Sequence, residues 1–74
     1  MTMTKAEKML ENLKKGYFTN SALKIPVYDG DGNPVTHWTF KRADMVKARE
    51  RGENVLEVLY DDLERFLREG DFRL

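Results

Sequence analysis

The chain of 74 residues contains no cysteine and a single histidine, His37. Without thiols it forms neither a disulfide nor a thiolate zinc site, and one imidazole does not supply a usual zinc ligand set. So short a chain buries only about 60% of the surface that its unfolded form exposes, so its stability is low and it needs other support. We expect that support to come from helix caps, an apolar core or a second copy of the chain.

The sequence also lacks long apolar runs. Its first residues, Met-Thr-Met-Thr-Lys, have no apolar stretch typical of a signal peptide, and no segment approaches the length of a membrane span. The absence of cysteine fits a reducing compartment. Because hydrophobic residues make up 41% and charged residues 35%, the composition is that of an ordered globular domain. We predict one cytoplasmic domain, residues 1–74, without membrane contact.

Three segments have helical character. Apolar residues recur at helical spacing over residues 5–15 and residues 55–69. Residues 41–51 predict a shorter helix that ends at Gly52, and its regularity is left open. The start and stop signals of the two clear helices are the capping pairs Thr4–Glu7 and Asn54–Glu57 and the left-handed glycines Gly16 and Gly70.

Residues 22–40 predict a β-hairpin. Apolar and polar residues alternate before and after the turn cluster at residues 29–34, which is the period of a strand with one wet face. Pro26 is tolerated because both strands of a two-stranded sheet are edges. The expected fold class is therefore a small single α+β domain, helix–β-hairpin–helix–helix (αββαα), with a two-stranded antiparallel sheet.

This layout is similar to that of the small head-completion proteins of long-tailed bacteriophages. The likeness rests on Gly16 ahead of the hairpin and on the amphipathic run 56–67 after it. No motif residue matches, and the segment 41–52 is extra. The resemblance implies a phage or mobile-element origin, and as a likeness of layout it says little about function.

Groups suited to catalysis are few. A nucleophile needs a base and an orienting group, but the chain offers only Ser21 and His37. Asp61 and Asp62 are adjacent and point about 100° apart on a helix. Arginines four residues beyond the acids predict the ion pairs of a solvated helix face (Asp61–Arg65, Glu64–Arg68). We predict that the chain is not an enzyme.

The turn Asp29-Gly30-Asp31-Gly32-Asn33 resembles the start of a calcium-binding loop. Completing that loop requires glycine at position six and glutamate at position twelve, and Pro34 and Phe40 stand there instead. Asp, Gly and Asn are also the residues of a polar hairpin turn. We therefore predict a turn, no cofactor, and no binding of calcium or zinc at physiological concentrations.

These exclusions favour a small non-catalytic protein-binding module, such as a regulator, an inhibitor or an adaptor of a larger assembly. The second hairpin strand, expected over residues 35–40, contains no proline, and only Lys41 and Arg42 just beyond it are charged, so its edge is suited to pairing with another strand. That strand would come from an unidentified protein or from a second copy in a homodimer. The candidate contact residues are Tyr28, Val35, His37, Thr39 and Val58.

The alternative is an accessory nucleic-acid-binding protein that uses the basic segment 41–51. Several cations on one surface neutralise phosphates, and this segment holds Lys41, Arg42, Lys47, Arg49 and Arg51. On a helical wheel these cations surround the segment. Residues 53–69 carry six acids against Arg65 and Arg68, a net −4 that is unsuited to a DNA groove. Both functions remain open from the sequence.

Overall fold

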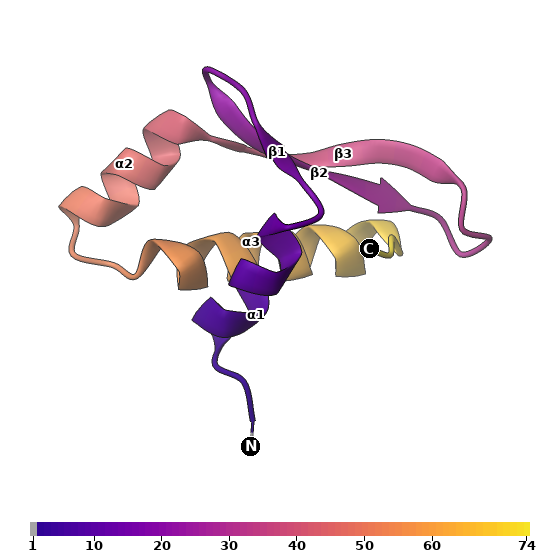
Figure 1. Ribbon diagram of the computed structural model, residues 1–74, viewed down its shortest axis with the longest axis horizontal. Coiled ribbons are helices and arrows are strands. Elements are labelled where there is room, and N and C mark those ends of the chain that lie inside the picture. The colour runs from indigo at the N-terminus through magenta and orange to yellow at the C-terminus, as the bar shows by residue number, and fades with distance from the viewer. Residues whose placement is uncertain (1) are drawn as a thin grey trace.

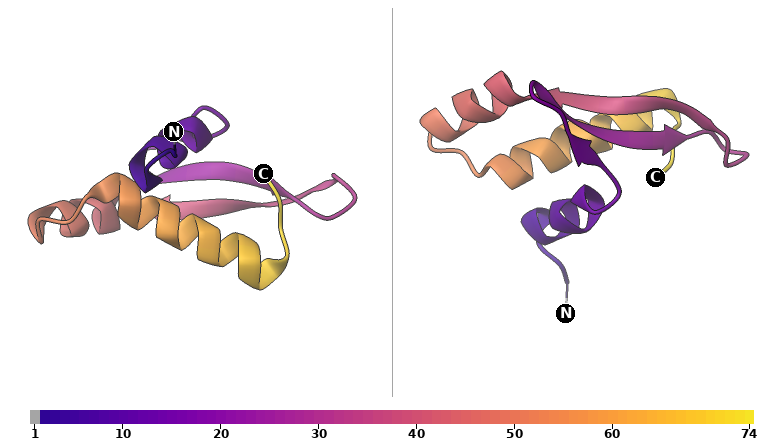
Figure 2. Two further views of the ribbon diagram at one scale, coloured as in Figure 1. Left: turned by 90° about the horizontal axis from the view of Figure 1, so that it is seen from below. Right: turned by 45° about the horizontal axis from the view of Figure 1, so that its top comes forward.

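Helices and strands occupy most of residues 2–74, which the computed structural model describes (Figure 1). A three-stranded antiparallel sheet forms one layer, and α1 and α3 lie on one side of it (Figures 1 and 2). The α+β class is confirmed. The elements in chain order are α1 (Lys5–Leu13), β1 (Tyr17–Phe18), β2 (Ala22–Tyr28), β3 (Pro34–Lys41), α2 (Arg42–Glu50) and α3 (Val55–Gly70).

The starts of α1 and α3 are as predicted. The backbone N–H of Glu7 donates to Thr4 Oγ1 at 3.2 Å. In α3 the backbone N–H of Glu57 donates to Asn54 Oδ1 at 3.3 Å. Each cap satisfies a donor that the first helical turn leaves free. The end of α1, at Leu13, comes two residues before the predicted one.

Two glycines serve a purpose other than the one predicted. Gly16 is not left-handed, and a Cβ on it would collide with the backbone carbonyl oxygen of Lys24 in β2. The absence of a side chain at position 16 therefore allows the backbone to pass close to the backbone of β2. Gly70 ends α3 against the ring of Phe72, and the left-handed residue is Asp71, with φ 54°. Gly52, with φ 78°, does close α2 as predicted.

The sheet has a strand that the sequence did not predict. Its order is β1-β2-β3, and β1 pairs with β2 through Tyr17↔Lys24 and Phe18↔Leu23. The prediction of two strands is wrong because a strand of two residues is too short to show an alternating period. As a result β2 is central, and β1 and β3 are the two edge strands of the sheet.

The core lies between the sheet and the helices. Leu59 and Leu63 of α3 belong to one buried cluster with Met9 of α1 and Trp38 of β3. Leu10 does not join them, because Met9 turns toward the core and leaves its neighbour 50% exposed. Phe66 and Leu13 are half-buried at the margin. The seven residues of the buried cluster are Met9, Leu23, Ile25, Val27, Trp38, Leu59 and Leu63.

The segment after β3 is a regular helix, α2, which settles the question left open by its sequence. It buries Ala48 and half-buries Met45, while Ala43 and Val46 face solvent. No helix within residues 2–74 combines the length and the apolar character that crossing a membrane requires. The cytoplasmic location stays a prediction.

Candidate functional site

The open edge of β3 is the main candidate for a binding site. β3 pairs with β2 alone, and β2 has β1 on its other side (Figure 1). The far edge of β2 is closed further along by Arg73. Its N–H donates to the Tyr28 carbonyl at 2.8 Å, and its carbonyl accepts the Tyr28 N–H at 2.7 Å. The other edge of the sheet is therefore blunted, whereas β3 is free along its length.

The register identifies which backbone groups face the open side. In an antiparallel pair, residues alternate between facing the partner strand and facing away. Tyr28 bonds Arg73, away from β3, so Pro26, two residues earlier, also faces away. Pro26 and Lys24 stand opposite His37 and Thr39.

The backbone N–H and C=O groups of His37 and Thr39 consequently point to the open edge. Outside the strand ladder, no backbone hydrogen bond within residues 2–74 uses these groups. The ladder to β2 depends instead on their neighbours, Trp38 and Phe40, which stand opposite Ile25 and Leu23. Pro26 fits here because its missing N–H would have faced the opposite edge, beyond β1.

The outer face of the sheet, opposite α1 and α3, carries an aromatic pair. The rings of Tyr17 and His37 meet edge to face with their centroids 6.1 Å apart. Tyr17 comes from β1 and His37 from β3, so the pair spans the central strand above Pro26. Tyr17 is 49% exposed. Sequence reasoning missed it as a surface residue because β1 itself was not predicted.

Negative charge is absent from the strands. Residues 12–28 and residues 34–43 contain no Asp or Glu. By register, Lys24 and Lys41 lie on the outer face with Thr39, and Arg42 follows at the start of α2. The cations of these two segments are Lys14, Lys15, Lys24, Lys41 and Arg42. The sheet is thus a basic layer, and the acids of α3 lie beneath it.

A hydrogen-bond network ties β3 to α3. Trp38 Nε1 donates to Asp62 Oδ2 at 2.9 Å, and Arg65 donates to Asp62 Oδ1 at 2.6 Å. The predicted pairing of Asp61 with Arg65 is wrong, because Asp61 binds Lys5 of α1 at 3.0 Å. One signal for this network was present in the sequence, because the ring N–H of a buried tryptophan usually needs a hydrogen-bond acceptor.

Val58 is the candidate contact residue in α3, and it is half-buried. It lies four residues before Asp62, so the two side chains share one face of the helix. Since Asp62 binds Trp38, this face of α3 is turned toward β3. Val58 therefore lies one helical turn before the residue that binds β3, and it is not among the residues packed against the core cluster.

The remaining predicted contact residues divide between the two ends of the sheet. Val35 is 48% exposed, at the bulge where Val27 pairs with Thr36 and Tyr28 with Pro34. Tyr28 is half-buried, and its backbone is occupied by Arg73. The open edge thus brings together His37 and Thr39, with Val35 at one end, and leaves Tyr28 on the far side of β2.

The basic segment of the alternative function is exposed throughout. Two of its guanidinium groups already have partners. Arg42 donates to the Thr19 carbonyl oxygen at 3.1 Å. Arg51 binds Glu53 at 3.0 Å, and the hydrogen bond to this carboxylate raises the pKa of Arg51. The other cations are Lys41, Lys47 and Arg49, interrupted by Asp44 and Glu50.

The aspartate-rich turn is a hairpin turn, as predicted. Asp29 Oδ1 accepts the backbone N–H groups of Asp31 and Asn33, each at 2.9 Å. The hydrogen bond from the Asn33 backbone is the main cause of a lowered pKa of Asp29. Gly32 takes the left-handed φ of 84° that the turn requires. No cluster of three metal-ligating side chains occurs in the described part of the chain.

The two potential catalytic side chains are far apart. The Ser21 carbonyl accepts the N–H of Arg42 at one end of the β2–β3 ladder, and His37 stands opposite Pro26 toward the other end. Strand geometry puts Ser21 and Pro26 roughly 15 Å apart. His37 packs against Tyr17 instead.

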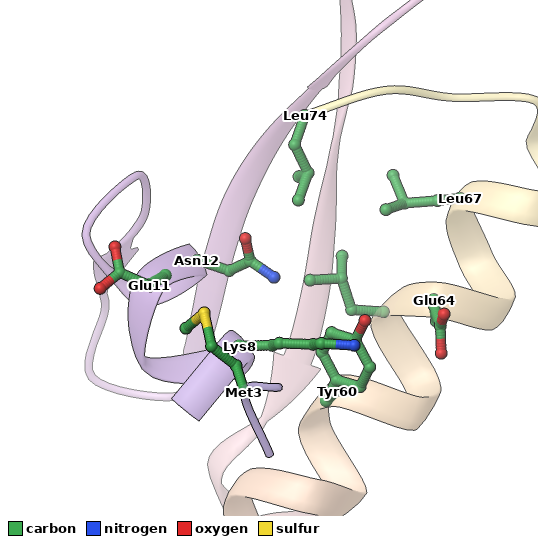
Figure 3. A pocket seen from close by; sticks show the side chains of 9 residues that line it. Met3, Lys8, Glu11, Asn12, Tyr60, Glu64, Leu67 and Leu74 are labelled. Atoms are coloured by element: carbon green, nitrogen blue, oxygen red, sulfur yellow. The ribbon is translucent and has the colours of Figure 1, made fainter. Parts of the chain in front are cut away.

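A groove of about 340 Å³ runs between α1, α3 and the last residue (Figure 3). Its floor is apolar, and the ammonium group of Lys8 lies 5.8 Å from the centre of the Tyr60 ring. Its rim mixes both signs of charge. The lining residues are Met3, Lys8, Glu11, Asn12, Tyr60, Leu63, Glu64, Leu67 and Leu74. Their arrangement selects no particular ligand chemistry.

Comparison with known proteins gave no relative: no family model, no curated protein and no solved structure matches the chain. The layout resemblance to phage head-completion proteins has no support from these comparisons.

Proposed function

We propose that this chain is a small non-catalytic protein-binding module that accepts an extended segment of another protein along β3. A regulator, an inhibitor or an adaptor of a larger assembly would act in this way. The observation that carries the proposal is the free edge of β3, with the backbone groups of His37 and Thr39 directed outward. Strand addition uses such groups for affinity and alternate side chains for specificity.

The features that block strand pairing are concentrated at the edge of the sheet opposite β3, which supports β3 as the binding edge. Natural sheets blunt exposed edges with proline, charge, short strands or covering segments. Here the opposite edge has Pro26, the short strand β1 and the Arg73 bridge. The β3 edge has Pro34 and the bulge at Val35 at its start and the cation Lys41 at its end, and no such residue lies between Thr36 and Phe40. An edge left open in a chain that blunts the other one is suited to pairing.

A proline at Thr39 tests this function. Thr39→Pro removes an outward N–H, while the β2 ladder, which uses Trp38 and Phe40, keeps its hydrogen bonds. We expect immobilised wild-type protein to retain a partner from an extract of the source organism, and Thr39→Pro to lose it. Thr39→Val is the matched control, because it keeps the N–H and the side-chain shape.

Circular dichroism and thermal melting must show that the Thr39→Pro protein is folded. If this folded variant retains the same protein as the wild type, β3 is not the binding edge. A partner lost by both Thr39→Pro and Thr39→Val would indicate a side-chain contact and would also contradict strand addition.

Binding of nucleic acid is the second candidate, because all five cations of residues 41–51 are exposed. Phosphate contacts would make the affinity fall steeply with salt. A gel shift with duplex and single-stranded DNA at two salt concentrations checks this function. Loss of the shift on replacing Lys47 and Arg49 by glutamine would place the contact on α2, away from the sheet.

A further inference from the structure

We propose that the segment added to β3 is acidic, with glutamate or aspartate alternating with apolar residues. This inference rests on the proposed function and specifies its partner. In a strand paired with β3, every second side chain points to the outer face of the sheet, and the others point toward the helices. The two faces differ in character, so the two sets of side chains meet different surroundings.

The outer face favours acids. Lys41 is on β3 itself, and Lys24 stands one strand further in, opposite Thr39. Neighbouring strands are about 4.8 Å apart, so a carboxylate beside Thr39 is roughly 10 Å from the Lys24 backbone. Long lysine and glutamate side chains close that distance over the short Thr39. The strands hold no acid that competes for these ammonium groups.

The inner side favours apolar residues. Phe40 is half-buried with its ring 5.9 Å from that of Trp38. Val58 lies on the face of α3 that is turned toward β3. A side chain pointing inward from an added strand would extend the layer formed by Trp38 and Phe40. Polar side chains there would lose water without gaining a partner.

The β3 strand of a second copy does not have the expected alternation of acidic and apolar residues. Self-pairing of two β3 edges would bring together two strands that each carry Lys41 and no acid. Neither strand would offer a carboxylate to the lysines of the other, so the pair would lack the favourable cross-strand charge pairs that stabilise a sheet. The charge of the edge therefore favours a different, acidic strand over a homodimer.

Synthetic peptides test the charge of the partner. The probes are a ten-residue peptide of alternating glutamate and valine and two relatives with lysine or glutamine in place of glutamate. Binding is followed through the amide resonances of His37 and Thr39 in the full chain. We expect the glutamate peptide to bind about tenfold more tightly than the lysine peptide, since two ammonium groups change from attraction to repulsion.

Charge reversal at the edge should reverse this preference. Lys24→Glu/Lys41→Glu is expected to favour the lysine peptide, and the neutral Lys24→Gln/Lys41→Gln is expected to lose the preference. Lys14→Glu/Lys15→Glu is the matched control. It changes the net charge equally but lies at the end of α1, beside the opposite edge of the sheet, so it should keep the wild-type preference.

Four outcomes would overturn the inference. Equal binding of all three peptides at His37 and Thr39 would leave strand addition standing without an acidic partner. If no peptide perturbs these amides, the acidic partner is rejected, and the Thr39→Pro comparison alone decides the proposed function. Displacement of the glutamate peptide by single-stranded oligothymidylate would assign the lysines to nucleic acid. Dimerisation without any peptide would make the second copy the occupant.

Discussion

The carboxylate of Asp62 accepts hydrogen bonds from two side chains, one on each layer of the fold. Trp38 is 1% exposed, and its ring N–H has this carboxylate as acceptor. Arg65 holds the second oxygen. The neighbouring Asp61 has the same chemistry but an exposed ion pair with Lys5. The two adjacent aspartates are therefore expected to contribute differently to the free energy of unfolding.

Asp62→Ala should destabilise the fold by about 1–3 kcal/mol, because it leaves the buried Trp38 N–H without its acceptor. The control, Asp61→Ala, removes an exposed ion pair and should cost less than about 1 kcal/mol. Urea denaturation followed by tryptophan fluorescence measures both. Equal costs for the two variants would show that the bond to Trp38 does not stabilise the fold.

The helices α1 and α3 pack together around one buried cluster, to which α1 contributes Met9 and α3 contributes Leu63. Leu63→Ala should cost about 2–5 kcal/mol, since it opens a cavity in a core where Leu63 is 1% exposed. A loss of that size is most of the stability of a small domain. Leu10→Ala, on the exposed side of α1, is the matched control and should change the melting temperature little. An unchanged melting temperature for Leu63→Ala would contradict this packing.

Hydrogen exchange distinguishes the two sides of β3. The amides of His37 and Thr39 face the open edge and should exchange rapidly, while those of Trp38 and Phe40, bonded to β2, should be protected. Exchange followed residue by residue by NMR checks this alternation. Protection of all four amides would mean that another strand already covers the edge.

Elements with a long repeat were predictable from the sequence. The helices α1 and α3 were found because they combine caps with apolar periodicity, and β2 and β3 because they alternate over seven and eight residues. β1 was not found, because two residues have no period. Gly16 was predicted to be a left-handed residue that ends α1, but it allows a close approach to the backbone of β2. This role depends on a strand that passes close to Gly16 only in the folded chain.

The candidate site was predictable in part. His37, Thr39 and Val35 follow from the hairpin alone, and the structure adds which backbone groups face outward. Tyr17 and the Asp62 network depend on contacts between distant segments. Spacing along one helix suggested a partner for Asp61 within α3, but a lysine from α1 lies nearer in space.

Over the whole molecule, charge is separated although the net charge is zero. The strands of the sheet carry lysines and no acid, whereas α3 is acidic, so the β3 edge of one copy has the same sign of charge as that of the next. We therefore expect the purified chain to sediment as a monomer of 8.7 kDa. Sedimentation equilibrium at low and moderate salt checks this mass. A dimer that Thr39→Pro dissociates would contradict the expectation.

The closed edge of β2 has a consequence for assembly. Polymerisation through strand pairing needs two complementary open edges on every subunit, so that each addition leaves a site for the next. Here β1, Pro26 and the Arg73 bridge block the side of β2 that faces away from β3. The sheet therefore has one edge that is open to strand pairing. If β3 accepts a strand as proposed, this chain offers no second edge of the same kind, and we expect one partner segment to bind each chain.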